Sequence, residues 1–146
     1  HGREAEATAK LALGQAAEVI PGAFGDIWFR DTGPIFDNAG VAHGFHFNGW
    51  GGKFPPFSDD ALLKARLCKH LDVPMYPIDL ILEGGAVAVD GEGTLITTEQ
   101  CLLNKNRNSA ADKALVERTL NESLGQGEVS AIVHCHSRHA RHWPAE

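Results

Sequence analysis

The sequence has no apolar run long enough to cross a membrane and no cluster of basic residues of the kind that binds nucleic acid. Its 146 residues carry 13 Lys and Arg against 19 Asp and Glu, so the formal net charge is −6. A membrane-spanning helix needs about 20 consecutive apolar residues, and a nucleic-acid-binding surface gathers Lys and Arg on one face. We therefore expect neither a membrane nor a nucleic acid as a partner.

Cysteines are few and odd in number. The three thiols, Cys68, Cys101 and Cys135, show no close pairing along the sequence, which favours reduced cysteines in a cytoplasmic protein over a disulfide framework. The polar start of the chain lacks the apolar segment of a signal peptide. The chain begins at His1 instead of Met, so we expect the natural N-terminus to lie upstream.

Two further sequence patterns are absent, those of a phosphate-binding loop and of a zinc site. The glycine-rich segment 48–57 lacks the pattern of a phosphate-binding loop. The His-rich segment 134–142 matches no zinc pattern with two paired ligand sets, so we expect no metal site. Cys68 lies in a predicted helix and Cys101 in an apolar, strand-like stretch, which predicts that both are small core residues and not nucleophiles.

The composition is that of a globular domain, with 43% hydrophobic and 22% charged residues. Short strands alternate with helices, so the predicted class is α/β or α+β, and no clean internal sequence repeat is visible. Ser58 and Ser109 are the expected caps of the second and third helices. The expected helices are 3–17, 58–70 and 109–122, and the expected strands are 18–20, an extended segment ending at 28–31, 34–37, 41–47, 80–82, 86–89 and 94–97.

The segment Trp28-Phe-Arg-Asp-Thr-Gly-Pro34 is the most informative part of the sequence. Its Gly-Pro pair ends regular structure and so presents Asp31 where a ligand can reach it. A carboxylate beside a flat aromatic ring suits a planar cation such as a guanidinium, because the carboxylate accepts paired N–H groups while the ring stacks on the cation. For the motif alone, an ion pair of Asp31 with Arg30 or a distant Lys is the simpler interpretation.

Glu83 is the second acid of interest. It follows an apolar strand and precedes Gly84 and Gly85, which permit a close approach of the backbone to a ligand. A carboxylate at such a junction is partly buried and needs a cationic partner. A structural role, in which Glu83 binds backbone N–H groups of its own turn, is the alternative. Asp31 and Glu83 together suit either a bound guanidinium or amine, or an acid/base pair for glycoside chemistry.

Five sequence blocks occur in the order found in one enzyme family. They resemble the N-terminal part of agmatine deiminases, which are similar to bacterial peptidylarginine deiminases; both belong to the guanidine-modifying pentein superfamily. The resemblance covers residues 18–126, and the second, third and fourth blocks favour the agmatine deiminase branch. The blocks are WFRDTGP at 28–34, FNGWGGKFPPF at 47–57, LEGG at 82–85, VDGEGTLITTEQCLLN at 89–104 and NRN at 106–108.

The resemblance implies both a fold and a chemistry. The fold is a pentein-type α/β propeller built from pseudo-symmetric ββαβ modules, of which this chain holds a part. The chemistry is hydrolysis of agmatine to N-carbamoylputrescine and ammonia, in putrescine biosynthesis, with no cofactor. In that reaction a cysteine thiolate attacks the guanidinium carbon to give a covalent thiouronium intermediate, and a histidine assists proton transfer. Carboxylates hold the guanidinium and orient its central carbon.

The resemblance also assigns roles to residues of this sequence. Asp31 resembles the guanidinium-binding Asp, and Glu83 resembles the active-site Glu of the EGG motif, so both are candidate catalytic and substrate-binding residues. Trp28 resembles the aromatic neighbour of the guanidinium-binding Asp. Weaker candidates for lining the pocket are Asn48, Trp50 and Gly84.

The departures from the family concern its catalytic centre. The family's catalytic His lies in a Gly-His-x-Asp motif and its nucleophilic Cys lies near the C-terminus, and this chain matches neither. Family members are also more than twice as long, so we expect an inactive fragment. We divide the chain into an agmatine deiminase-like segment, 1–127, and an aberrant His- and Arg-rich tail, 128–146, for which we hypothesise a shifted reading frame or a truncated gene.

The expected partner is a small guanidino compound such as agmatine. A fragment of a closed propeller exposes sheet edges, so we also expect self-association into homo-oligomers. The alternatives are a non-catalytic module that binds guanidines or amines, and a fragment of a peptidylarginine deiminase-type enzyme. A protein-interaction domain that uses Trp50, Phe54 and Phe57 as anchors is a further alternative.

Overall fold

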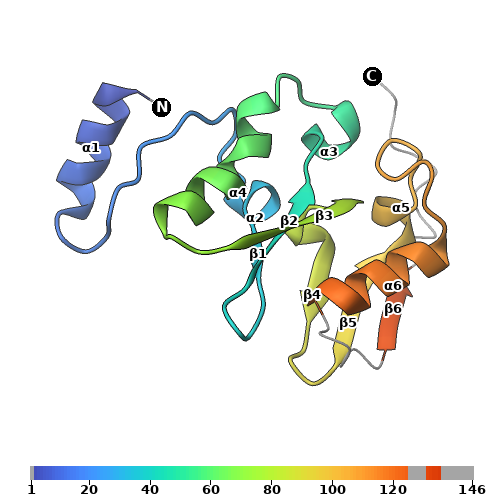
Figure 1. Cartoon of the computed structure of the whole chain (residues 1–146). Coiled ribbons are helices and arrows are strands. Elements are labelled where there is room, and N and C mark those ends of the chain that lie inside the picture. Colours follow the sequence, from blue (N-terminus) through green and yellow to red (C-terminus); the bar gives the residue numbers. More distant parts are fainter. Residues whose placement is uncertain (1, 125–130, 136–146) are drawn as a thin grey trace.

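Two copies of one small unit of strands and helices make up most of the chain. The computed structural model describes residues 2–124 and the backbone of 131–135 (Figure 1). We name residues 35–81 the first module and residues 87–135 the second module. Each module contributes one three-stranded sheet.

The first module is a ββαβ unit. β1 (Ile35–Phe36) pairs antiparallel with β2 (Ala42–His46), and β2 pairs in parallel with β3 (Met75–Ile81). The connection from β2 to β3 contains α3 (Gly49–Gly52), a short helical turn, and α4 (Ser58–His70), which packs against β2.

The second module repeats this topology. β4 (Val87–Val89) pairs antiparallel with β5 (Thr94–Thr98), and β5 pairs in parallel with β6 (Ala131–Cys135). The connection contains the short helix α5 (Glu99–Leu102) and then α6 (Lys113–Leu124). The α+β class and the ββαβ modules expected from the sequence are therefore confirmed.

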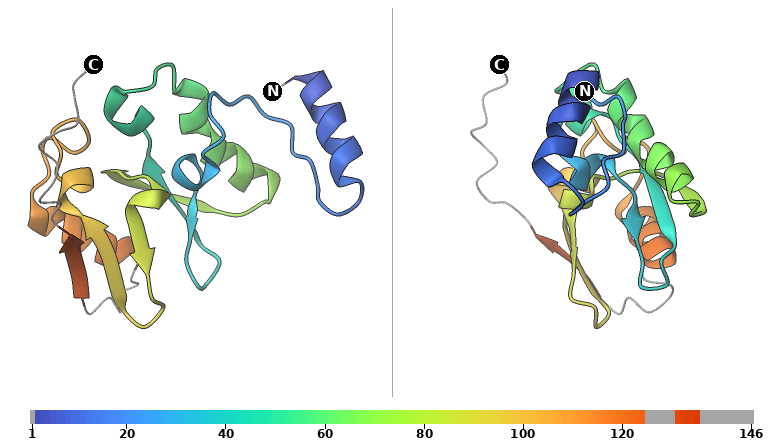
Figure 2. Two further views of the ribbon diagram at one scale, coloured as in Figure 1. Left: turned by 180° about the vertical axis from the view of Figure 1, so that it is seen from behind. Right: turned by 90° about the vertical axis from the view of Figure 1, so that its left-hand side faces the viewer.

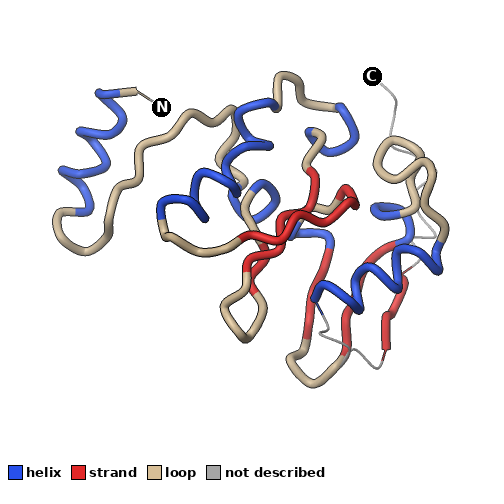
Figure 3. The backbone as a smooth tube through the Cα atoms, viewed as in Figure 1, coloured by secondary structure: helices blue, strands red, loops and turns tan. Residues whose placement is uncertain are grey.

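The two hairpin turns show the same repeat at the level of single hydrogen bonds. Asp37 and Asp90 occupy equivalent places, and each accepts the backbone N–H groups of the residues two and four positions further on, at 2.8 to 2.9 Å. Both turns point toward the same side of the molecule, downward in Figure 3. An Asp at the start of a turn stabilises it by this bonding to its own backbone.

One hydrophobic core joins the modules. Its buried members come from β2 and β3 in the first module, from Leu82 just after β3, and from β4, β5, α5 and α6 in the second module. α6 also packs against β3. Full burial of one Leu side chain contributes roughly 1.5–3 kcal/mol, so each module depends on the other for stability. The buried core residues are Phe45, Leu80, Leu82, Val87, Leu95, Leu102, Val116 and Leu120.

Three short elements lie outside the modules. α1 (Arg3–Leu13) buries no residue and stands apart from the sheets, joined to them by a long extended segment (Figure 1, Figure 2). α2 (Phe29–Thr32) is one helical turn, and it packs against the 3₁₀ turn η1 (Gly84–Ala86) that links the two modules. Among the described residues, no helix has both the length and the apolar character required to span a membrane.

Three predictions of extended structure are wrong. Residues 18–20 pair with no strand and lie in the segment between α1 and α2. Of residues 28–31, Trp28 precedes the helical turn α2 and the other three belong to it; α2 ends at Thr32, before Pro34. The stretch around Cys101 is the helix α5, because the Thr98 side chain caps it by accepting the Cys101 backbone N–H at 3.2 Å.

Several predicted boundaries also shift. α1 ends at Leu13 because Gly14 takes a left-handed φ of 54°. Ser58 is the first residue of α4 and not its cap. α6 begins at Lys113, because the Asp112 carboxylate accepts the N–H of Leu115 at 2.8 Å and so caps the helix.

β3 begins well before the predicted strand 80–82. It pairs with β2 from Met75 onward and accommodates Pro77, because it is an edge strand whose outer N–H groups need no partner.

Candidate functional site

Asp31 is held by one donor on each carboxylate oxygen. Its Oδ1 accepts the backbone N–H of Gly85, and its Oδ2 accepts the indole N–H of Trp50, both at 2.9 Å. The side chain is half-buried, and among the described residues it forms no ion pair with Arg30 or any other cation. Within the described part of the chain, the Asp31 carboxylate therefore has no cationic partner, and its two hydrogen bonds fix its orientation.

Two glycines allow this approach. A Cβ on Gly84 would collide with the backbone carbonyl oxygen of Arg30, and a Cβ on Gly85 would lie 2.5 Å from Asp31 Oδ1. Gly84 is buried, and it lets η1 pack closely against α2. The two glycines after Glu83 thus bring the Asp31 carboxylate against the linker between the modules.

Glu83 is buried and paired with an arginine of this chain. It is 3% exposed, and its Oε1 accepts the Nε–H of Arg107 at 3.0 Å. The Arg107 side chain is only 12% exposed. A buried carboxylate needs a cationic partner, as expected from the sequence for Glu83. Arg107 is that partner.

A tight turn at 48–52 carries Trp50. Asn48 caps this turn by accepting the N–H of Gly51 at 2.8 Å, and its amide donates to the carbonyl of Asn106 at 2.8 Å. Trp50 has a left-handed backbone, with φ 56° and ψ 44°, which is uncommon for a residue other than glycine. Its ring meets Phe47 edge to face, with centroids 5.0 Å apart.

The aromatic side chain that contacts Asp31 is Trp50. Trp28 contributes its backbone carbonyl, which accepts the N–H groups of Asp31 and Thr32, while the residue as a whole is 58% exposed. The sequence assigned the aromatic neighbour to Trp28 and only pocket lining to Trp50. A stacking role for the Trp28 ring stays a prediction.

The structure thus connects all six candidate residues through hydrogen bonds and backbone contacts, although Trp28 is connected only through its backbone carbonyl. Asp31 is linked to Trp50 directly and to Glu83 through the Gly84–Gly85 backbone, and Asn48 holds the turn that carries Trp50. The roles of all six residues in binding or catalysis remain predictions.

Sequence reasoning missed Arg107 as a member of the site. Its signals were present, because Glu83 needs a cationic partner and Arg107 lies in the matched block NRN.

The two cysteines whose side chains are described lie in packed surroundings. Cys68 is buried on α4, and burial raises the pKa of its thiol, which disfavours the thiolate form. Cys101 packs against the hydrophobic core. Both are free thiols and core residues, as expected. No group of three His, Cys, Asp or Glu side chains that could hold a metal ion occurs in the described part of the chain.

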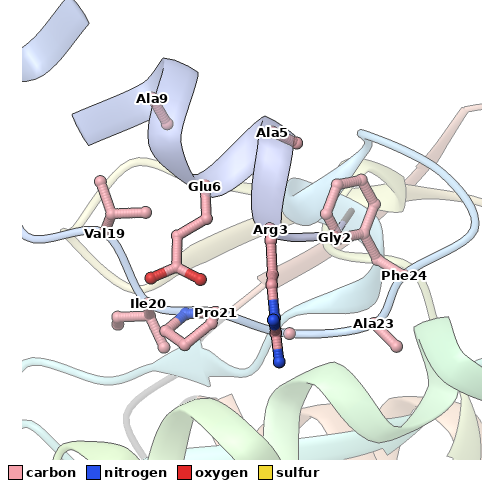
Figure 4. A pocket seen from close by; sticks show the side chains of 11 residues that line it. Gly2, Arg3, Ala5, Glu6, Ala9, Val19, Ile20, Pro21, Ala23 and Phe24 are labelled. Carbon is pink, nitrogen blue, oxygen red and sulfur yellow. The ribbon is translucent and has the colours of Figure 1, made fainter. Parts of the chain in front are cut away.

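A hollow of about 440 Å³ lies between α1 and the segment that follows it, lined by residues including Arg3, Glu6, Ile20 and Phe24 (Figure 4). None of the six candidate residues lines this hollow. The size of a hollow does not identify chemistry, so we base the candidate site on the converging hydrogen-bonding groups around Asp31.

Comparison with known proteins identifies the fold and the family. The agmatine deiminase of Enterococcus faecalis superposes with a TM-score of 0.79 at 31% identity, over 90% of this chain and 37% of that one. A C. jejuni agmatine deiminase structure with substrate bound superposes with a TM-score of 0.69 at 33% identity, over 79% of this chain and 34% of that one. The chain therefore has the modules of a pentein-type α/β propeller.

A family model described as Porphyromonas-type peptidyl-arginine deiminase matches residues 1–139. The chain belongs to this family. The agmatine deiminase of Pseudomonas aeruginosa strain LESB58 is 46% identical over 108 residues, which are 68% of this chain and 29% of the relative. That of Pseudomonas fluorescens strain SBW25 is 41% identical over 113 residues, 71% of this chain and 31% of the relative. The chain spans about a third of the length of these relatives.

The tail is described only in part. The backbone of 131–135 forms β6, parallel to β5, and the family match extends to residue 139. Residues 125–130 and 136–146 lie outside the described part. The domain boundary at residue 127 and the shifted reading frame stay predictions.

Proposed function

We propose that this chain supplies the guanidinium-binding part of an agmatine deiminase-like hydrolase. The observation that carries the proposal is the Asp31 carboxylate, which has one N–H donor on each oxygen and no cationic partner among the described residues. Each carboxylate oxygen has two lone pairs, so each keeps room for a further N–H group. A guanidinium presents its N–H groups in a planar fork that matches two such oxygens.

Asp31 and Glu83 have different parts in this proposal. Arg107 already compensates the charge of Glu83, whereas the charge of Asp31 is left for a ligand. Asp31 therefore provides most of the attraction for a guanidinium, and Glu83 provides a second acceptor close to it. The relatives are agmatine deiminases, which supports agmatine as the guanidino compound to test.

Calorimetric titration with agmatine tests the proposal. We expect the wild-type chain to bind agmatine and Asp31→Asn to bind roughly 10–100-fold more weakly, because hydrogen bonds to charged groups contribute about 1.5–3 kcal/mol. Asp79→Asn is the matched control, because Asp79 is a fully exposed carboxylate on β3 and its replacement changes the net charge equally. Equal affinities of the wild type and Asp31→Asn would refute the proposal.

The branch of the family is tested by the choice of ligand. We propose that free agmatine binds more tightly than a short arginine-containing peptide under the same conditions. Tighter binding of the peptide would favour the peptidylarginine deiminase-type alternative.

We further propose that the chain binds substrate without hydrolysing it. Cys68 is buried on α4 and Cys101 packs against the hydrophobic core, so both of these thiols have the surroundings of structural residues. We expect no release of ammonia from agmatine in a coupled assay. Turnover that Cys101→Ala abolishes would contradict this expectation. A cytoplasmic location, in which the thiols stay reduced, belongs to the same proposal.

A further inference from the structure

The geometry points to Arg107 as a positioning residue of the guanidinium site, an inference that rests on the function proposed above. Arg107 belongs to the loop between α5 and α6, in the second module. Its Nε–H nevertheless donates to Glu83, which follows β3 of the first module, at 3.0 Å. Both side chains are almost closed off from solvent, with 12% and 4% exposed.

The hydrogen bond from Arg107 fixes one oxygen of Glu83. A buried carboxylate stays ionised only when a cation or several donors compensate it. The Arg107 guanidinium supplies that charge at Oε1, and among the described residues Oε2 has no hydrogen-bond partner. Arg107 therefore sets the orientation in which Glu83 offers its second oxygen to a ligand.

The second contact is with the turn that carries Trp50. A Cβ on Gly51 would lie 2.7 Å from the Arg107 guanidinium and would collide with the Asn106 amide. The Asn106 carbonyl also accepts the Asn48 amide that caps the same turn. The loop at 106–107 thus packs directly behind the turn.

These two contacts connect Arg107 to both candidate acids. It reaches Glu83 directly, and it reaches Asp31 through the turn whose Trp50 indole N–H donates to Asp31 at 2.9 Å. An arginine that only balanced a buried charge would affect the stability of the chain but not the hydrogen bond between Trp50 and Asp31. The two roles therefore predict different results for the Trp50 indole.

Nuclear magnetic resonance of the Trp50 indole N–H, without any ligand, separates these roles. In Arg107→Ala we expect this resonance to shift and its exchange with solvent to accelerate by roughly tenfold, because the turn at 48–52 loses the side chain that packs against it. Arg107→Lys keeps the charge but not the planar fork, so it should give a smaller change. Arg118→Ala, an exposed residue of α6, is the control and should leave the resonance unchanged.

A pair of neighbouring glycines tests the packing independently. Gly51 and Gly52 have similar left-handed φ angles of 83° and 78°, so replacement by Ala strains the backbone similarly at both. Only Gly51 faces Asn106 and Arg107, since a Cβ on Gly52 would meet nothing within 4 Å. We expect Gly51→Ala to alter the Trp50 resonance and to weaken agmatine binding several-fold more than Gly52→Ala does.

The outcomes distinguish this inference from the proposed function. If the wild-type chain binds no agmatine, the proposed function fails, while the Trp50 resonance still decides whether Arg107 positions the turn. An unchanged Trp50 resonance in folded Arg107→Ala would overturn the inference, whatever the affinity for agmatine. If Arg107→Ala does not fold, a wild-type resonance in both Arg107→Lys and Gly51→Ala would overturn it.

Discussion

The two ββαβ modules follow the same path but bury different residues. The inward-facing residues are Asp60, Lys64 and Cys68 on α4, and Val116, Leu120 and Ser123 on α6. α6 thus adds two apolar side chains to the shared core, whereas α4 buries two ionisable groups. Asp60 accepts the backbone N–H groups of Gly25 and Asp26. Among the described residues, Lys64 has a single hydrogen bond, to the Ala61 carbonyl at 3.4 Å.

The modules also differ in the short turn that follows the second strand of each, β2 or β5. In the second module the Thr98 side chain caps α5, an ordinary helical turn that adds Leu102 to the core. In the first module the Asn48 side chain caps a turn in which Trp50 takes a left-handed backbone and reaches Asp31. The first module supplies Trp50 and Asn48 to the candidate site and has strained and polar features, and the second supplies much of the apolar packing that stabilises both.

Truncation of one buried side chain on α4 and one on α6 should give the largest difference in stability between the two modules. We expect Leu120→Ala on α6 to lower the free energy of unfolding by about 2–5 kcal/mol, because it leaves a cavity in the core. Cys68→Ala on α4 removes a smaller group and should cost about 1 kcal/mol. Urea denaturation measures both. Equal losses would show that α4 supports the core as strongly as α6.

Asp37 and Asp90, at equivalent places in the two hairpin turns, allow a more closely matched comparison of the modules. Asp37 also accepts from His43 Nε2 at 3.0 Å, and both side chains are buried. Asp37→Ala should therefore cost about 1–3 kcal/mol, because it leaves His43 buried without a partner. Asp90 is exposed, so Asp90→Ala should cost less. A greater loss in Asp90→Ala, measured by the same denaturation, would show that the buried contact between Asp37 and His43 does not add to the stability of the first turn.

The pH dependence of the Asp90 contribution has a defined sign. The N–H groups of Glu92 and Thr94 lower the pKa of Asp90 in the folded chain. Its contribution is therefore present above the pKa of the unfolded chain and is lost as the pH falls through the lower folded pKa. The wild type and Asp90→Ala should accordingly become equally stable in strong acid.

Lys64 should give the smallest effect, and one of opposite sign. Burial lowers the pKa of Lys64, so Lys64→Met should raise the free energy of unfolding by about 1 kcal/mol at neutral pH. The unfolded chain holds the Lys64 proton more tightly, so wild-type stability should rise between the lowered pKa and the ordinary lysine value. Lys64→Met should lack that rise, and exposed Lys69→Met should retain it. A destabilised Lys64→Met would show that the charge is compensated.

The elements predicted well from the sequence are those fixed by short-range chemistry. Both hairpins were expected from their turn residues, and the turns at Asp37 and Asp90 are held by bonds within five residues. The helices 58–70 and 109–122 were placed correctly to within a few residues, because the acidic first turn of α4 and the capping Asp112 before α6 are local signals. The identity of the two acids followed from their flanking glycines and from the family resemblance.

The features that the sequence did not predict depend on contacts between distant segments. Phe29–Thr32 forms a helical turn against η1, more than 50 residues away in sequence, and β3 extends to Met75 because β2 lies beside it. The left-handed backbone of Trp50 is unusual for a large side chain and has no sequence signature. The pairing of Arg107 with Glu83 joins the loop after α5 to the linker between the modules, so the sequence indicates that Glu83 needs a cationic partner but not which residue it is.

The central claim is that Asp31 binds a guanidinium. A crystal structure of the chain with agmatine tests it most directly. We expect the guanidinium nitrogens within hydrogen-bonding distance of both Asp31 oxygens, next to the Trp50 indole and η1. Agmatine bound elsewhere, or held at this site through its amine with the guanidinium in solvent, would contradict the claim.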